Sequence, residues 1–323
     1  MRYNYNSNLA PHIIGLIRQK HSNGFIYNDA QWHLKKLDEF LLEHFPKEST
    51  ITHEVASKWS VIRLTEGKQF RRHRVVILRQ LCFYILSLGL EAYVPRSVSA
   101  TEKSVLYIPS QQEISDFFKE LDSWEDDTAK RPNYIRKYKT MFRLYYCCGL
   151  RLSEVRLLKR EHLNLEEGTL TILQSKGRKD RLVYLPQDGI AMLSAHLEYV
   201  DMKMPTSEWL FPGQAANGTV SPTGISRTFT KCWMQLPHAA KTTKRPSVHC
   251  LRHAFVVERL NDWMARGIDL QEMLPYLSSH LGHASPSGTF YYYHLVSKAF
   301  DVVRQKDKVS MRVIPEVLAY EEA

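Results

Sequence analysis

The 323-residue chain has few cysteines, and they follow no disulfide or metal-binding pattern. The five cysteines are odd in number, and no two of them are spaced as C-x-x-C. We therefore expect reduced thiols, most of them in apolar surroundings, and a cytoplasmic location. This composition argues against a small secreted domain held together by disulfide bonds.

Long apolar runs are also missing. No stretch approaches the ~18 apolar residues of a membrane span, so we expect no membrane partner. Residues 1–6 contain no apolar segment of the kind found in secretory signals. Internal repeats and low-complexity tracts are absent as well. With 44% hydrophobic residues, the chain can bury a sizeable core, and its length suggests two domains.

The charge is strongly positive and is spread along the whole chain. There are 44 lysines and arginines against 34 acidic residues, which gives a net charge of +10 and a pI of about 9.3. An even spread of positive charge indicates a protein that binds a polyanion such as nucleic acid. The alternative is a soluble protein that is basic without such a partner.

Residues 8–90 have apolar positions at helical spacing throughout, which predicts an all-helical domain over 1–95. A long helix is expected over 69–88, and its first turns are basic. We expect Arg71, Arg72 and Arg74 to contact DNA; a charged face without a partner is the alternative. Pro95 and the polar residues after it predict a linker over 96–107.

The second domain, 108–305, is predicted to be mixed. Alternating apolar residues predict an antiparallel hairpin of strands 169–173 and 181–185, joined by a turn at 174–180. Helices are expected at 111–121, 133–148, 152–160, 187–200, 225–236, 247–265 and 270–279. The fold class is therefore mainly α with a small antiparallel β-sheet in the C-terminal domain. A tail of 306–323 completes the chain.

The chemistry-bearing residues gather in the last third of the chain. His249 and Arg252 lie three apart and so share a helix face, and His283 precedes three consecutive tyrosines, 291–293. Guanidinium groups bind phosphate oxygens bidentately, and a phenol can attack phosphorus. Structural histidines and core tyrosines are the alternative interpretation.

A zinc site is a second alternative for the same histidines. His249 and His253 stand at i and i+4, and His280 with His283 could complete a tetrahedral shell. However, Cys250 stands where the H-E-x-x-H pattern has glutamate. We expect no metal and no cofactor.

Four segments, 149–154, 175–181, 249–255 and 281–294, occur in one order that resembles the tyrosine recombinases, or phage-type integrases. The helical first domain is similar to the SAM-like core-binding domain of that family. The resemblance implies a two-domain DNA clamp in which the α+β second domain is catalytic. It implies six catalytic residues: Arg151, Lys176, His249, Arg252, His283 and Tyr292.

The resemblance also implies a role for each of these residues. Two arginines would clamp the scissile phosphate and the histidines would hydrogen-bond it, although Arg151 alone could be a surface ion pair with Glu154. Lys176 would protonate the leaving 5′ oxygen, with Lys179 as its rival. Tyr292, nine residues after His283, would be the nucleophile. Further contacts to DNA are expected from two basic residues of the hairpin, Lys179 and Arg181.

The implied reaction is two successive transesterifications through a 3′-phosphotyrosyl intermediate, on double-stranded DNA with a specific recombination site. A tetramer on DNA and a free monomer are expected, in a prokaryotic cytoplasm at the nucleoid. The tail could dock on a neighbouring protomer or pack on its own domain. We predict integration and excision of a mobile element. The alternatives are an Xer-like dimer resolvase, a type IB topoisomerase-like enzyme, a non-catalytic DNA-binding regulator and a zinc hydrolase.

Overall fold

The computed structural model describes residues 3–99, 106–125, 134–173, 180–213, 218–239, 246–283, 285 and 287–293. The chain forms two compact units, Met1–Val105 and Leu106–Ala323, and each has its own hydrophobic core. The division between them falls inside the segment 96–107 that was expected to be a linker. In the described ranges, no helix has both the length and the apolar character needed to cross a bilayer.

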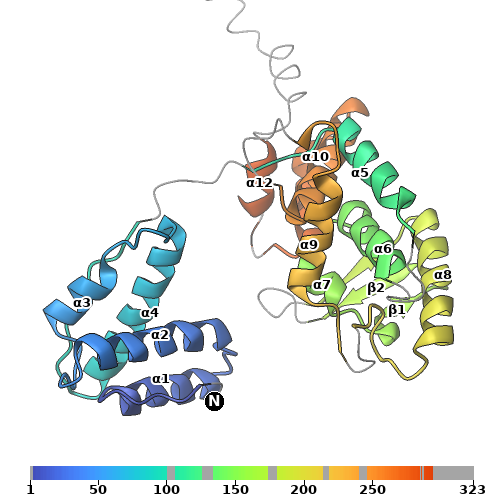
Figure 1. Cartoon of the computed structure of the whole chain (residues 1–323). Coiled ribbons are helices and arrows are strands. Elements are labelled where there is room, and N and C mark those ends of the chain that lie inside the picture. The colour runs from blue at the N-terminus through green and yellow to red at the C-terminus, as the bar shows by residue number, and fades with distance from the viewer. Residues whose placement is uncertain are drawn as a thin grey trace, which may run out of the picture. The chain divides into compact units, whose positions relative to one another are not determined.

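The first unit, called the helical unit below, consists of helices α1 (Ala10–Ser22), α2 (Asn28–His44), α3 (His53–Ser60) and α4 (Lys68–Ser87) (Figure 1). The predicted all-helical character is confirmed. α4 contacts each of the other three helices. It buries Leu78, Leu81 and Ile85 because these residues recur at helical spacing on one face.

The second unit, called the C-terminal unit below, contains a small sheet and nine described helical segments, of which α6 is the central one. They are α5 (Gln111–Ser123), α6 (Tyr134–Cys147), α7 (Leu152–Arg156), η1 (Arg160–His162), α8 (Gln187–Lys203), α9 (Pro222–Trp233), α10 (His249–Ala265), α11 (Leu270–Leu281) and α12 (Ser287–Tyr293). A capping box starts α5, because Ser110 and Glu113 bond each other's backbone N–H groups.

The sheet has the order β1 (Leu163–Asn164), β2 (Thr169–Ile172) and β3 (Arg181–Tyr184), and both pairings are antiparallel. The predicted fold class is confirmed. The helix expected over 152–160 was too long, and β1 was missed. The backbone leaves the helix after α7 because the Leu158 carbonyl accepts from Leu210 N–H (2.9 Å) and Arg160 N–H donates to the Glu208 carbonyl (2.9 Å).

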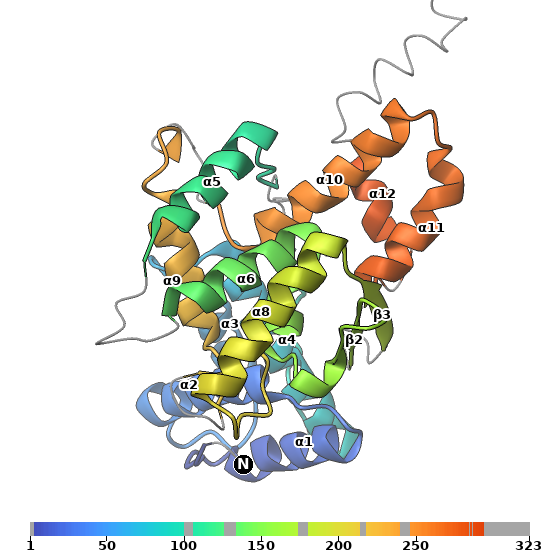
Figure 2. The same ribbon diagram turned by 90° about the vertical axis from the view of Figure 1, so that its right-hand side faces the viewer.

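Helices α10, α11 and α12 form a second, smaller hydrophobic cluster at one end of the unit, where they lie side by side (Figure 2). Phe255 and Leu260 of α10 pack there with Leu277 and Leu281 of α11, and Tyr292 of α12 completes the cluster. This packing brings the His249–Arg252 segment close to the tyrosine segment, although about forty residues separate them in the sequence.

Candidate active site

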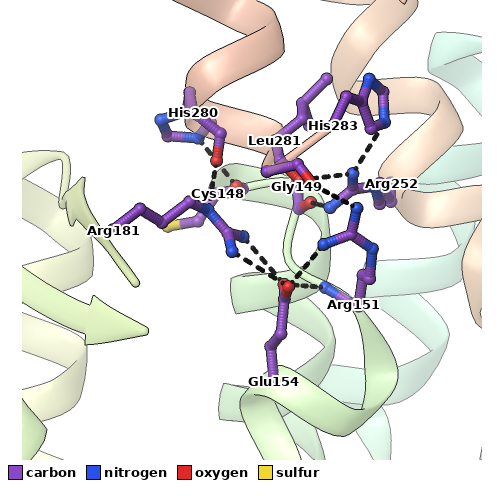
Figure 3. A network of polar contacts seen from close by, with 10 residues as sticks. Cys148, Gly149, Arg151, Glu154, Arg181, Arg252, His280, Leu281 and His283 are labelled. Atoms are coloured by element: carbon purple, nitrogen blue, oxygen red, sulfur yellow. Dashed lines mark hydrogen bonds and ion pairs between the residues drawn. The ribbon is translucent and has the colours of Figure 1, made fainter. Parts of the chain in front are cut away.

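Arg252 is the centre of the site. Its side chain projects from the first turn of α10 and is 1% exposed. Nη1 donates to the Gly149 carbonyl (2.6 Å), and Nη2 donates to the Leu281 carbonyl (2.8 Å) and to His283 Nε2 (3.1 Å) (Figure 3). Burial and the charge of Arg151 lower the pKa of Arg252 to about 10, so it stays charged at neutral pH.

Two glycines allow the backbone to approach the guanidinium groups this closely. Gly149 and Gly282 both have left-handed φ angles, +60° and +63°. A Cβ at Gly149 would lie 2.4 Å from the Phe255 ring, and one at Gly282 would lie 2.9 Å from Arg181 Nη1. Any other residue would therefore be strained and would disturb the arginine cluster.

Arg151, the N-cap of α7, is linked to the same cluster. Its Nη2 donates to the Gly282 carbonyl (2.8 Å), and its Nη1 donates to Glu154 Oε1 (2.7 Å). The Glu154 carboxylate also accepts two bonds from Arg181, at 3.0 and 2.9 Å. Burial alone would raise the pKa of Glu154, but the bonds and charges of these two arginines outweigh it and lower the pKa to about 2.

Arg181 was predicted to contact DNA, and in this structure its guanidinium is bonded within the protein. Its side chain is 8% exposed, its Nε donates to the His280 carbonyl (2.6 Å), and both of its terminal nitrogens bond Glu154. The guanidinium thus ties β3 to α7 and α11 and has a structural role beside the site.

Tyr292, the proposed nucleophile, is 5% exposed, and its hydroxyl lies 2.6 Å from His253 Nδ1. Burial raises the pKa of Tyr292, while the charges of Arg252 and Arg151 act in the opposite direction. The phenol therefore lies within electrostatic reach of both guanidinium groups. Its neighbour Tyr291 is exposed, so the two tyrosines are in different environments.

The two predicted phosphate-binding histidines are in different situations. His283 accepts from Arg252 at Nε2, so its Nδ1 carries the proton and donates to Thr289 Oγ1 (2.8 Å). His249 is exposed and has no hydrogen-bond partner in the described ranges. Desolvation by surrounding atoms and the charges of Arg252 and Arg151 lower the pKa of both histidines to about 4. Both are thus neutral at pH 7.

The arginines have donors left for an anion. A guanidinium has five N–H groups. Among the described residues, Arg252 uses three of them and Arg151 uses two. The cluster of Arg151, Arg181 and Arg252 contains a single carboxylate, that of Glu154. A tetrahedral oxyanion with negative charge is the ligand that fits these donors and this excess of positive charge.

The histidines considered as zinc ligands have other contacts. His280 Nε2 is 3.0 Å from the Cys148 carbonyl, while His253 and His283 contact Tyr292 and Arg252. The described residues contain one group of potential ligands with all ligand atoms within 4.8 Å of one another: Asp29, His33 and His73 of the helical unit.

In the helical unit, Arg74, another predicted DNA contact, is bonded within the protein. The side chain is 1% exposed, and its Nε and Nη2 bond the two oxygens of the buried Glu66 at 2.5 and 2.7 Å. Arg71 donates from Nε to the Ser60 carbonyl (2.7 Å), and Arg72 is exposed. These two arginines remain predicted DNA contacts.

The structure adds His253, which the sequence offers only as a potential metal ligand, to the residues of the site. His253 follows Arg252 directly, yet its partner Tyr292 lies 39 residues further along the chain. One feature of the sequence could have indicated that His253 belongs to the site: it follows His249 by one helical turn. Lys176 and Lys179 lie outside the described residues.

Comparison with known proteins identifies the family. The sequence model of the Phage integrase family matches residues 110–298, which is more than half of the chain, and the chain therefore belongs to that family. The resemblance inferred from the four segments is thus confirmed.

Two curated relatives are similar to the chain over different lengths. Tyrosine recombinase XerD of Proteus mirabilis is 32% identical over 177 residues, 52% of this chain and 50% of that protein. XerD of Rhizobium meliloti (strain 1021) is 26% identical over 228 residues, 70% of each protein. The chain thus spans about half the length of the first of these relatives.

The fold also occurs among solved structures. The Tn1549 transposon integrase in complex with a circular-intermediate DNA superimposes with a TM-score of 0.63, at 16% identity, over 91% of this chain and 99% of that chain. At this identity the likeness establishes the fold.

Proposed function

We propose that the protein is a site-specific tyrosine recombinase, a DNA strand transferase that cuts and rejoins DNA through a 3′-phosphotyrosyl intermediate. One observation carries the proposal: the buried Tyr292 phenol lies within electrostatic reach of Arg252 and Arg151, both of which have unused N–H donors. Such a cluster suits a phosphodiester that gains negative charge as the phenol attacks. Family membership and the similarity to XerD support the same conclusion.

The roles of the side chains follow from their contacts. Arg252 and Arg151 would bind the non-bridging oxygens of the scissile phosphate. His249, exposed and without a described partner, would donate a third hydrogen bond, and His283 would hold Arg252 in place through its 3.1 Å contact. Lys176 would protonate the leaving 5′ oxygen.

The proposed partner is duplex DNA that carries a recombination site. Several solved neighbours are recombinases or integrases bound to DNA, including XerH on its difH substrate and a lambda integrase dimer on a core site. Exchange of strands between two duplexes needs four cleavages, so we propose that four protomers assemble on DNA. The core-binding role of the helical unit and the catalytic role of the C-terminal unit belong to the same proposal.

The biological role that we propose is integration and excision of a mobile element. The similarity in fold to a transposon integrase bound to circular-intermediate DNA supports it. The similarity in sequence to XerD supports a second candidate, resolution of chromosome or plasmid dimers.

Covalent trapping tests the proposed reaction without knowledge of the target site. The protein is incubated with a pool of nicked random-sequence duplexes, and the DNA that survives a denaturing wash is recovered and sequenced. We expect enrichment of one site by wild-type protein and by Tyr291→Phe, and loss of the adduct in Tyr292→Phe. Failure of wild-type protein to form any adduct would favour a non-catalytic DNA-binding regulator.

A second assay separates recombination from strand passage. Two duplexes of different length, each with the selected site and one fluorescent label, are incubated with the protein. A recombinase produces chimeric duplexes of two new lengths. A type IB topoisomerase-like enzyme would relax a supercoiled plasmid and leave the labelled duplexes unchanged.

A further inference from the structure

The Tyr292 hydroxyl has a specific partner inside the protein. The Tyr292 oxygen lies 2.6 Å from His253 Nδ1, and the two rings are tilted by 43° with centroids 5.5 Å apart. Both side chains are buried, at 5% and 7% exposure. No other hydrogen bond to this hydroxyl is present within the described residues. A buried hydrogen bond this short positions the phenol firmly.

The direction of this hydrogen bond follows from the charges around His253. Burial, the neighbouring His249 and the Arg252 guanidinium lower the pKa of His253 to about 3, so the imidazole is neutral. The Tyr292 phenol is protonated, because its pKa is raised by burial. The phenol therefore donates its proton to the Nδ1 lone pair, and the other ring nitrogen of His253 carries the imidazole hydrogen.

A tyrosine must lose its proton to become a strong nucleophile, and the other histidines of the site are poorly placed to accept it. His283 accepts from Arg252 at one nitrogen and contacts Thr289 with the other. His249 touches His253 edge-on, with centroids 4.6 Å apart, and makes no hydrogen bond to Tyr292 among the described contacts. His253 is already bonded to the proton that has to leave.

We propose that His253 is a catalytic residue that holds the Tyr292 hydroxyl in the free protein and takes its proton during DNA cleavage. The inference rests on the proposed function. In the cleavage step the phenolic oxygen bonds to phosphorus and the bond from phosphorus to the 5′ oxygen breaks. The phenol proton moves to His253 Nδ1, and the leaving oxygen takes a proton from Lys176. Rejoining reverses each transfer, so both side chains return to their initial states.

DNA binding favours this transfer. The charged and titratable groups that face His253 are Arg252, His249 and the phenol itself, and the first two lower its pKa. A phosphodiester bound to Arg252 and His249 would place negative charge near the His253 imidazole. That charge stabilises a protonated His253 in the complex, so the base becomes stronger when its substrate is present.

The first test is a pH profile of single-turnover cleavage on the selected site. His253→Asn keeps an acceptor atom near the position of Nδ1 but cannot take a proton. We expect about 100-fold slower cleavage at pH 7. We also expect the logarithm of the variant's rate to rise by about one per pH unit, as it does for an unassisted phenol, while the wild-type rate stays flat between pH 6 and pH 9. His238→Asn, a histidine of the same unit outside the site, should match wild type.

The second test separates the base from the acid. A substrate with sulfur in place of the bridging 5′ oxygen has a leaving group that needs no proton, because a thiol is far more acidic than an alcohol. This substrate should restore cleavage by Lys176→Ala and leave the His253→Asn defect in place. Restoration of both variants would contradict the assignment of His253 as the base.

Two further outcomes keep the inference distinct from the proposed function. If wild-type protein forms no adduct, the proposed function itself fails. If wild-type protein forms the adduct and His253→Asn cleaves at the same rate with a flat pH profile, only the role of His253 is wrong. Should the variant not fold, the ¹⁵N shift of His253 Nδ1 in the whole chain serves instead. It should change in Tyr292→Phe, and no change would mean that the hydroxyl is not held there.

Discussion

The two units each bury an arginine at 1% exposure, and the two guanidinium groups have different hydrogen-bond partners. In the helical unit, Arg74 bonds both oxygens of Glu66, which is itself buried, so one cation meets one anion. In the C-terminal unit, Arg252 bonds two carbonyls and a histidine, and no ion pair with a carboxylate is found for it within the described part of the chain. The one carboxylate of its cluster, Glu154, is shared by Arg151 and Arg181.

We interpret this difference as that between an arginine with a structural role and one that is available to a ligand. A buried ion pair compensates its own desolvation, at least in part, so it needs no ligand. A cluster of three guanidinium groups and one carboxylate keeps an excess of positive charge in a partly buried place, which costs folding free energy. An anionic ligand would offset that cost, which agrees with the proposed binding of a scissile phosphate to this cluster.

The largest expected effect is on the cleavage rate. Arg252→Gln removes charge and donors from the phosphate, and we expect single-turnover cleavage to fall about 1000-fold. Arg74→Gln should leave the cleavage rate at saturating DNA within about 3-fold of wild type, because its guanidinium is committed to Glu66. Quenched-flow assays with the selected site measure both. Equal losses of cleavage rate in the two variants would contradict the different roles assigned to Arg252 and Arg74.

The free energy of unfolding should depend strongly on Arg74, in contrast to the cleavage rate. Arg74→Met leaves the Glu66 carboxylate buried without its partner, so we expect a loss of about 3 kcal/mol in the free energy of unfolding of the helical unit. Adding Glu66→Leu should restore most of that loss, since an apolar pair of similar volume replaces the ions. Urea unfolding, followed by circular dichroism, provides the comparison. If the losses of stability from the two substitutions add in the double variant, Arg74 and Glu66 do not stabilise each other.

The Glu154 carboxylate makes the free energy of unfolding depend on pH. Its folded pKa of about 2 lies below the ordinary 4.5, so its contribution to stability is present above pH 4.5 and is lost as the pH falls towards 2. Unfolding free energies of wild type and Glu154→Gln should therefore differ by about 2 kcal/mol less at pH 3 than at pH 6. A difference that does not change with pH would contradict the ion pairs with Arg151 and Arg181.

The sequence could predict the parts of the site that lie in short segments. His249, Arg252 and His283 were expected from their spacing and from the family resemblance. In the structure His283 bonds the Arg252 guanidinium, and the charge of Arg252 acts on His249. The burial of Arg74 and Arg181 in ion pairs could not be predicted, because burial of an arginine depends on a distant partner. Glu154 is 27 residues from Arg181, and no periodicity reports that pairing. The contact of His253 with Tyr292 could not be predicted either, because the two residues are 39 positions apart.

The smallest effect concerns free anions. Sulfate is a tetrahedral oxyanion like the phosphate group, and it should stabilise the wild-type C-terminal unit by about 1.4 kcal/mol at ten times its dissociation constant. Arg252→Gln should abolish this stabilisation and Arg74→Gln should keep it. Thermal unfolding of the whole chain in sulfate, against sodium chloride of equal ionic strength, measures it. Identical shifts in both variants would indicate a general salt effect.

The most direct measurement is mass spectrometry of the trapped protein–DNA adduct after digestion with trypsin and nuclease. The linked peptide contains three adjacent tyrosines, and fragmentation assigns the nucleotide to one of them. We predict a 3′-phosphonucleotide on the oxygen of Tyr292, the phenol buried beside Arg252 and His253. A nucleotide on Tyr291 or Tyr293, or on any other side chain, would contradict the account.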